Sequence, residues 1–559
     1  MKKLLLLVCA FFVAQGLSAQ VWVPLVSDLV NLESFRHQAT QSIEDDLDNG
    51  IDGTDIFKVK GARIYTNLSN LVTSTESPDS SANTVVIGAT SPIYKGWKLT
   101  AFYANANSNN SFDGNIDETN YEDTDFDEDF DEMYFQHMDS TAKDEESTNS
   151  ILVNLGKQMG KGTELAFTYK RMNYNNTEEM EDSAYYISRT LVPTVSVDEF
   201  WYGSETYLGG RTSPVTTYAL SYSKPYRNWT ARGDLFFISG GENFNSEETG
   251  SYFEDRDPGD ASTVFTTNDT INIIDNHEYT ANLVGIGLRI SDLNKNTGLL
   301  WEVGGNYGMA FGSGNADYVD REHLITQDEL IPSQIQIFDS LYADSMIAPI
   351  SVSGNVMGLN GRIEWQIADN VKFGLGFLAN SFSLSQEQDR TSKSDIIVYA
   401  NDDDGIPDMD DYTLTVSGTG REETYTLETK ENRIAIPAGI ELNFGKNKDW
   451  YLRLGAIGVG SKTEFTEKMV TDTVYLSESE IVYGTGSSST TLGTTTTDTD
   501  YDVSESFTEQ DVYYSYGLGW KPSPNLSLDL IGMFDATNVE LLSTDWLRSL
   551  KLSATINIY

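Results

Sequence analysis

The clearest candidate for metal chemistry is a run of carboxylates at 401–411, which reads Asn-Asp-Asp-Asp-Gly-Ile-Pro-Asp-Met-Asp-Asp. Calcium prefers several hard oxygen ligands, and a glycine lets a short loop fold back around the ion. The sequence therefore predicts a calcium site with the ligands Asp402, Asp404, Asp408 and Asp411. The alternative is an acidic turn that is simply solvated. A weaker version of the pattern spans 46–52.

Catalytic residues are scarce. The chain has four histidines, at His37, His137, His277 and His323, and none lies in a recognisable nucleophile motif. Hydrolases need a histidine close to a serine or an acidic partner. The single cysteine, Cys9, lies in the first apolar run, so disulfides and thiol chemistry are excluded from the mature chain. We therefore expect no enzymatic activity.

The formal net charge is -48, and the acidic residues concentrate between the predicted strands. Phosphate binding needs basic patches, so nucleic acid is excluded as a partner. The segment 113–146 is the most acidic and interleaves aromatic residues with its carboxylates. It is interpreted either as a cation-binding constriction loop or as an exposed, solvated loop. Divalent cations could also link it to lipopolysaccharide.

A second set of charged residues recurs at alternate positions within otherwise apolar strands. A period of two places such residues on one face of a strand, opposite the apolar ones. The candidates are Lys98, Lys170, Arg232, Asp234, Arg289, Glu302, Arg362, Glu364, Lys372, Arg433, Glu441 and Arg453. Charge is costly against lipid and tolerated in a wet lumen. These residues therefore either line a polar channel or pair into salt bridges that close it.

Glycines share this inward face, at Gly285, Gly287, Gly304, Gly308, Gly374, Gly376, Gly439 and Gly455. Small residues leave room for water, for an inserted loop or for the segment 20–60, which precedes the predicted strands. The sequence does not decide between these occupants.

The alternating pattern repeats along the chain. Candidate strands are 61–71, 83–91, 96–106, 150–158, 163–173, 215–224, 228–239, 278–291, 299–311, 351–367, 371–384, 431–444, 450–464, 510–521, 525–535 and 547–559. The connection after every second strand is short, whereas most of the others are long and acidic. This pattern predicts an all-β fold, a transmembrane antiparallel β-barrel of about 16 strands (14–18) with short periplasmic turns and long external loops.

Three regions precede or form this barrel. Residues 1–19 are typical of a signal peptide, with Lys2 and Lys3, an apolar run and a small-residue cleavage site. Residues 20–60 are predicted to be a periplasmic segment, part of it helical. This segment either tucks into the barrel mouth or forms a tail that packs nowhere. Residues 61–559 form the barrel.

Six tryptophans mark one edge of the predicted strands, beside the short turns: Trp97, Trp229, Trp301, Trp365, Trp450 and Trp520. Amphipathic rings prefer a membrane interface. With the signal peptide, the alternation of short and long connections and a last strand that ends at Tyr559, the chain resembles Gram-negative outer-membrane β-barrel proteins. The stretch 401–411 likewise resembles the calcium loops of thrombospondin type-3-like repeats.

The resemblance implies location in the outer membrane among lipid and lipopolysaccharide, and insertion by the barrel-assembly machinery. The leading functional hypothesis is a porin-like channel for passive transport of small polar or charged solutes. The alternative is a surface-display barrel with a plugged lumen whose acidic external loops bind calcium or a partner. Either form could assemble as a homo-oligomer.

Overall fold

The computed structural model describes most of the chain. The described residues are 35–44, 46–68, 80–122, 132–190, 198–257, 264–294, 297–331, 334–401, 411–445, 447, 449–475, 477–486, 488–493, 500–535 and 551–558. The expected signal peptide, Tyr559 and three of the candidate calcium ligands (Asp402, Asp404 and Asp408) lie outside these ranges.

Short helices precede a single large sheet. The helices are α2 (Phe35–Thr40), α3 (Asp46–Ile51), η2 (Gly53–Lys58) and, within a turn, η3 (Gly160–Gly162). The strands are β1 (Ala62–Leu68), β2 (Ser80–Pro92), β3 (Trp97–Glu122), β4 (Glu132–Gln158), β5 (Glu164–Thr190), β6 (Asp198–Tyr226), β7 (Trp229–Asp257), β8 (Val264–Asn294), β9 (Leu299–Ile331), β10 (Gln334–Ala368), β11 (Val371–Asn401), β12 (Tyr412–Phe444), β13 (Trp450–Tyr475), β14 (Ser477–Tyr483), β15 (Ser488–Gly493), β16 (Tyr501–Ser523), β17 (Leu526–Asp535) and β18 (Lys551–Ile558).

The sheet closes into an antiparallel barrel because β1 pairs with β2 on one side and with β18 on the other. Of its 18 strands, β14 and β15 form a side hairpin that pairs with the far part of β12, while β13 pairs directly with β16. The closed ring therefore contains the sixteen strands that the sequence predicts. Closure removes the free edges that an open sheet would expose.

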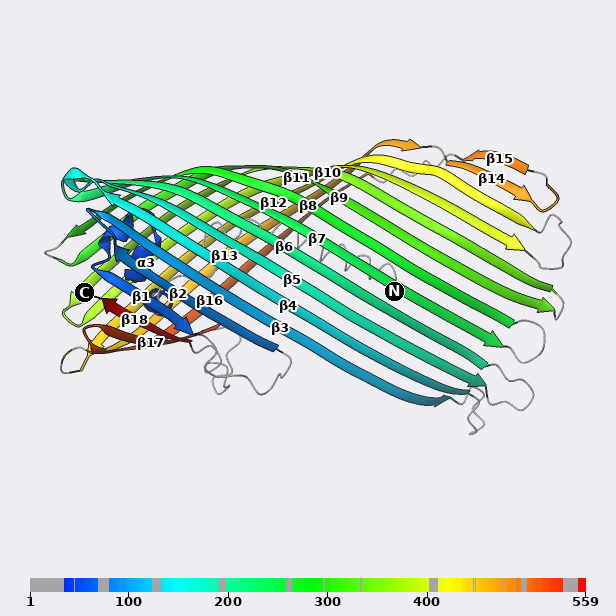
Figure 1. Cartoon of the computed structure of the whole chain (residues 1–559), viewed down its shortest axis with the longest axis horizontal. Helices are drawn as coiled ribbons and strands as arrows, with labels where there is room; N and C mark the ends of the chain where they lie inside the picture. The colour runs from blue at the N-terminus through cyan, green and yellow to red at the C-terminus, as the bar shows by residue number, and fades with distance from the viewer. Residues whose placement is uncertain are drawn as a thin grey trace.

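The structure differs from expectation in the long connections, which are mostly paired strand rather than loop. Strands β9 and β10 have 33 and 35 residues and stay in register from Trp365↔Leu299 to Ile335↔Glu329. At about 3.3 Å per residue, β9 is roughly 110 Å long. About ten residues suffice to cross a bilayer. The strands thus continue well past one bilayer thickness as a curved wall, called the extension here (Figure 1).

The outer face of the barrel changes character along each strand. On β9, outward Val303, Met309 and Phe311 are apolar and 51–59% exposed, whereas the next outward residues are Ser313 and Asn315. This change marks the end of an apolar belt around the barrel. The six tryptophans lie at its other rim, beside the short turns, and the rings of Trp450 and Trp520 stack 5.5 Å apart.

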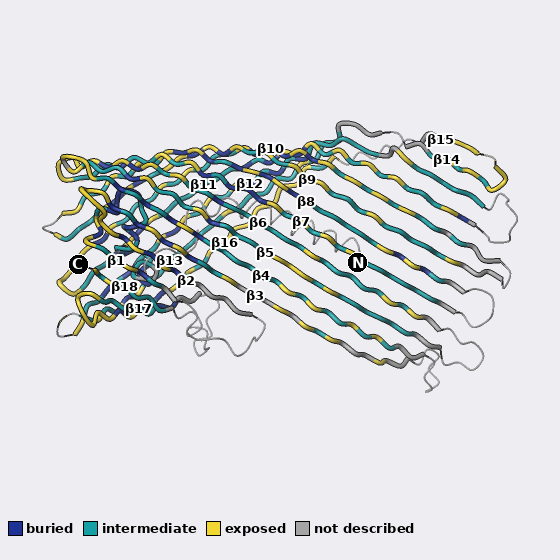
Figure 2. The backbone as a smooth tube through the Cα atoms, viewed as in Figure 1, coloured by how far each residue is buried: buried dark blue, intermediate teal, exposed yellow. Residues whose placement is uncertain are grey.

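Small residues on the inner face of β9 allow the neighbouring strand β8 to approach closely. A Cβ at Gly312 would collide with the Thr280 carbonyl on β8. Leu283 on β8 and Ile350 on β10 belong to one buried apolar cluster on either side of this strand. Buried residues gather in the barrel, and the extension is mostly half-buried or exposed (Figure 2). Among the described residues, no helix combines the length and apolarity needed to span a membrane.

Candidate functional site

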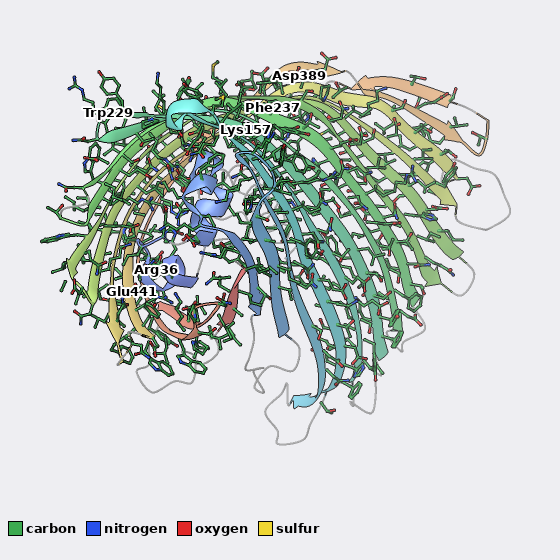
Figure 3. All side chains as sticks on the ribbon, turned by 60° about the vertical axis from the view of Figure 1, so that its left-hand side comes forward. Arg36, Lys157, Trp229, Phe237, Asp389 and Glu441 are labelled. Carbon is green, nitrogen blue, oxygen red and sulfur yellow. The ribbon has the colours of Figure 1, made fainter. Side chains whose placement is uncertain are left out.

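The three helices that precede the first strand lie inside the barrel, at the end with the short turns. Helix α2 contacts β12, β13, β16 and β17, and η2 contacts β3, β4, β5 and β6. These strands belong to different parts of the ring, so residues 35–60 cross the lumen. We call this segment the plug; it is seen within the ring of strands in Figure 3.

The first polar contact joins α2 to the wall. The Nη2 and Nε groups of Arg36 donate hydrogen bonds to the two oxygens of the Glu441 carboxylate, at 2.7 and 2.8 Å. This is the bidentate geometry that a guanidinium and a carboxylate prefer. Figure 3 labels the two residues next to each other. Arg453 also donates to Glu441, at 2.9 Å, and to Asp529. Glu441 is buried, and both of its oxygens accept hydrogen bonds from guanidinium groups.

A second contact joins the turn before η2 to the opposite wall. Asp52 accepts from Arg232 at 2.8 Å and from Arg289 at 2.6 Å, and Asp55 lies 3.2 Å from Arg289. Arg232 also pairs with Asp234 at 2.8 Å. Burial opposes ionisation of Asp52, but the two guanidinium groups outweigh it and hold its pKa well below its ordinary value. This contact therefore holds a fully charged carboxylate at neutral pH.

The third contact lies between α2 and α3. The Glu44 carboxylate contacts Arg362, which also reaches Glu302 at 3.4 Å. The backbone N–H of Glu44 donates to Glu364 at 3.3 Å, and Glu364 pairs with Lys372. Burial raises the pKa of Glu44 to about 7 despite the neighbouring guanidinium. Glu44 is thus the plug carboxylate whose charge is least secured.

Glycines on the inner wall let the plug lie directly against the sheet. A Cβ at Gly439 would collide with the Thr40 backbone, one at Gly374 with Ser42, and one at Gly455 with the Ala39 and Thr40 backbone. The space left by these inward glycines is therefore filled by the plug.

Backbone groups of the plug are also bonded to the wall. The Ser515 hydroxyl donates to the Ala39 carbonyl at 3.1 Å, and Asn154 donates to the carbonyls of Gly50 and Gly53. Apolar plug residues also pack against the wall: Ile43 and Ile56 are fully buried, and Leu47 and Ile51 pack against a buried cluster that includes Phe102 and Leu152. Polar and apolar contacts together fix its position.

The twelve predicted lumen residues fall into two groups. Ten lie at or directly behind the plug: Lys98, which donates to the Val59 carbonyl, together with Arg232, Asp234, Arg289, Glu302, Arg362, Glu364, Lys372, Glu441 and Arg453. Lys170 lies opposite Leu152 and Thr217, and Arg433 lies opposite Asn380 and Ser461, both on the inner wall.

The sequence predictions did not include the plug residues that face these side chains, chiefly Arg36, Glu44, Asp52 and Asp55. Their signal is the acidic run 44–55, which complements the excess of basic residues on the inner strand faces. Asp46 and Asp52, noted as a weak calcium pattern, instead contact Arg63 and the pair Arg232 and Arg289.

Metal binding has limited geometric support in the described ranges. No group of three or more histidine, cysteine, aspartate or glutamate side chains is arranged there to hold an ion. Of the candidate calcium ligands, only Asp411 lies within those ranges, just before β12. The histidines do not converge: His137, His277 and His323 each pair with a separate aspartate in the extension.

Comparison with known proteins gives distant matches only. No family model matches the chain, and no curated protein matches it. A mutant of the ferric enterobactin receptor from Pseudomonas aeruginosa, in complex with enterobactin, is 9% identical, with 89% of this chain and 81% of that chain covered and a TM-score of 0.25. The alcaligin outer-membrane receptor FauA from Bordetella pertussis is 10% identical, with 89% and 75% covered and a TM-score of 0.21. TM-scores this low support no conclusion about function.

A bulky residue at Gly439 should displace the plug. Gly439→Val would place methyl groups where the Thr40 backbone lies, and overpacking of this kind costs about 1–3 kcal/mol. The readout is maleimide labelling of a cysteine introduced by Ala39→Cys, a position that is fully buried. Labelling should accelerate several-fold. Gly458→Val is the matched control because that glycine has nothing within 4 Å. Equal labelling in both variants would contradict the docked plug.

Acidification should first tighten the plug and then loosen it. The pKa of Glu44 is about 7 when docked, against an ordinary 4.5, so the docked state binds the proton more strongly. Docking therefore strengthens as the pH falls from 7 to about 4.5. Asp52 has a lowered pKa, so its contribution disappears at more acidic pH.

Hydrogen exchange of residues 35–60, corrected for intrinsic rates, measures this profile. Protection should be greatest near pH 5. Glu44→Gln should flatten the profile between pH 4.5 and 7, and an unchanged profile in that variant would contradict the assignment to Glu44.

Proposed function

We propose that this protein is an outer-membrane barrel for passage of small polar or charged solutes, closed in this state by the plug. Three features support the membrane location: a closed ring of sixteen strands, an exposed apolar belt about as tall as a bilayer requires, and a rim of tryptophans. The extension would then project from the outer surface, because the short turns of such barrels face the periplasm.

The observation that carries the function is the chemistry of the plug–wall interface. Its principal contacts are ion pairs, made by Arg36, Glu44 and Asp52. The desolvation cost of buried ion pairs roughly offsets their attraction, so such pairs specify a position more than they stabilise it. A plug held in this way suits a movable gate, and a lumen lined with charged groups suits hydrated solutes. The acidic segment 113–146, interpreted from the sequence as a possible constriction loop, is therefore not needed as the gate.

Conductance in a planar bilayer tests the gate. The wild-type protein should stay mostly closed, and deletion of residues 35–60 should produce stable open steps through the polar lumen. Heat-modifiable gel mobility confirms that each variant is folded. Open steps that are as frequent and as long-lived in the wild-type protein would contradict closure by the plug.

A variant in which the plug is crosslinked to the wall gives a second test of the gate. A Cβ at Gly517 would lie 2.7 Å from the Ala39 Cβ, slightly nearer than a disulfide prefers, so Ala39→Cys with Gly517→Cys should crosslink after a small shift. The oxidised protein should be silent, and reduction should restore brief openings. Openings that persist in the crosslinked protein would mean that the plug is not the gate.

A second candidate function is the binding of a cationic partner by the extension, or of calcium by the motif at 401–411. The inner face of the extension carries Glu248, Asp320 and Asp344 on β7, β9 and β10 at one level of the ladder. Burial, together with the neighbouring Glu205 and Asp320 carboxylates, raises the pKa of Glu248 to about 7. Carboxylates that repel one another in this way favour a bound cation.

Calcium titration calorimetry separates the two acidic regions. Asp402→Asn with Asp404→Asn removes half of the ligands of the sequence motif. Glu248→Gln with Asp320→Asn neutralises the inner face of the extension. The double substitution in the region that holds the ion should weaken calcium binding about tenfold or more, since affinity follows the ligand charge count. Absence of calcium binding to the folded wild-type protein would reject the calcium hypothesis.

A further inference from the structure

A cavity of about 190 Å³ remains between the plug and the inner wall, on the side of β8 to β12. The plug contributes His37 and Glu44 to its lining, and the wall contributes Arg289, Glu302, Asn360 and Arg362. Phe377, Leu378 and Pro437 add apolar surface, so the cavity has charged groups on both sides of a partly apolar space that is large enough for a small solute. It lies at the contact where the plug carboxylate is least secured.

Arg362 has donor capacity that the protein does not use. A guanidinium offers five N–H donors. Within the described part of the chain, the Nε of Arg362 is buried and has no hydrogen-bond partner, while Nη1 faces Glu44 and Nη2 faces Glu302. A buried donor that lacks an acceptor carries a desolvation cost of about 1–3 kcal/mol. An additional acceptor at this position would remove that cost.

Glu44 is a weak occupant of the same guanidinium. Burial raises its pKa to about 7, so near neutral pH the carboxyl group is only partly ionised. A small solute carboxylate keeps an ordinary pKa and arrives fully charged. It can also meet the guanidinium with two oxygens, the stronger arrangement for this pair. The Glu44 carboxylate contacts Arg362 through Oε1, so a solute that uses two oxygens can compete for this guanidinium.

We propose that this cavity binds a small carboxylate-bearing solute, and that its carboxylate replaces Glu44 on Arg362 and frees the segment between α2 and α3. The inference rests on the proposed function, since it supplies a solute class and a trigger for the same gate. The other two contacts, Arg36 with Glu441 and Asp52 with Arg232 and Arg289, do not involve Glu44. The solute thus releases one contact of three and loosens the plug without expelling it.

The probe is lactate, and lactamide is its uncharged isostere. Ser42 lines the cavity and is buried, so Ser42→Cys provides a nearly isosteric reporter in a mature chain expected to have no other thiol. Lactate should accelerate labelling of this thiol by a charged methanethiosulfonate about tenfold, the effect of losing one charged hydrogen bond. Lactamide and sodium chloride at equal ionic strength should have little effect.

Calorimetry with variants assigns the binding. Arg362→Gln should weaken lactate binding at least about tenfold. Glu44→Gln should retain or strengthen it because the competing charge is gone. Arg433→Gln, which removes an inner-wall guanidinium that does not line the cavity, should leave it unchanged. Lactate binding that survives Arg362→Gln, or no binding at all, would overturn the inference.

The two proposals fail separately. If the crosslinked plug silences the channel but lactate changes neither labelling nor heat of binding, the gate stands and the carboxylate trigger is wrong. If lactate binds at Arg362 but the crosslinked barrel still conducts, the site stands and the plug is not the gate. If lactate accelerates labelling equally in the Arg362→Gln variant, the effect does not pass through this guanidinium and the inference is rejected.

Discussion

Cationic side chains on the inner wall need partners, and this requirement organises the closed end of the barrel. A guanidinium removed from water costs several kcal/mol unless a carboxylate faces it. Arg232, Arg289 and Arg362 meet that need through carboxylates of the plug, at Asp52 and Glu44. Glycines on the wall allow the plug to approach within this distance. Charge and shape on the strands therefore specify the same occupant.

The plug and the wall differ in how they are held. Each strand of the wall is hydrogen-bonded to both neighbours in a closed ring, so local opening there must break a ladder. The plug is short, and its ties are individual side-chain contacts. Elements with few apolar contacts open at lower free energy than the core of a fold. A stable ring around a more weakly held insert is the division that a gate requires.

The membrane part of the fold could be predicted from the sequence because apolar residues recur at every second position there, as in 434–444. The extension could not be recognised in the same way. On β9 beyond Gly312, both faces are largely polar, so the apolar period is absent although the backbone pairing continues. A strand that is polar on both faces resembles a loop in sequence, because the apolar period of two is the pattern that distinguishes a strand from a loop.

The inner-wall charges could likewise be predicted, but their partners could not. A period of two identifies the face of Arg362 and Glu441. It contains no information about which distant residue meets them, and α2 and α3 have six residues each, too few for a periodic pattern. What the sequence does contain is the complement of charge: acid at 44–55 and base on the strands. A buried interface must be close to electrically neutral, and this requirement predicts that the acidic run 44–55 lies against the basic strand faces.

The two ends of the molecule differ in electrostatic balance, and this difference bears on which solutes can enter. At the plug, acids and bases are paired, whereas acidic residues predominate on the extension in a chain of net charge -48. A negative wall repels free anions at low salt, but screening limits this to about 8 Å at physiological ionic strength. A carboxylate that also carries an ammonium group escapes the repulsion and still presents its carboxylate to Arg362. Among carboxylates, zwitterions should therefore reach the cavity most readily, and their advantage should shrink as salt rises.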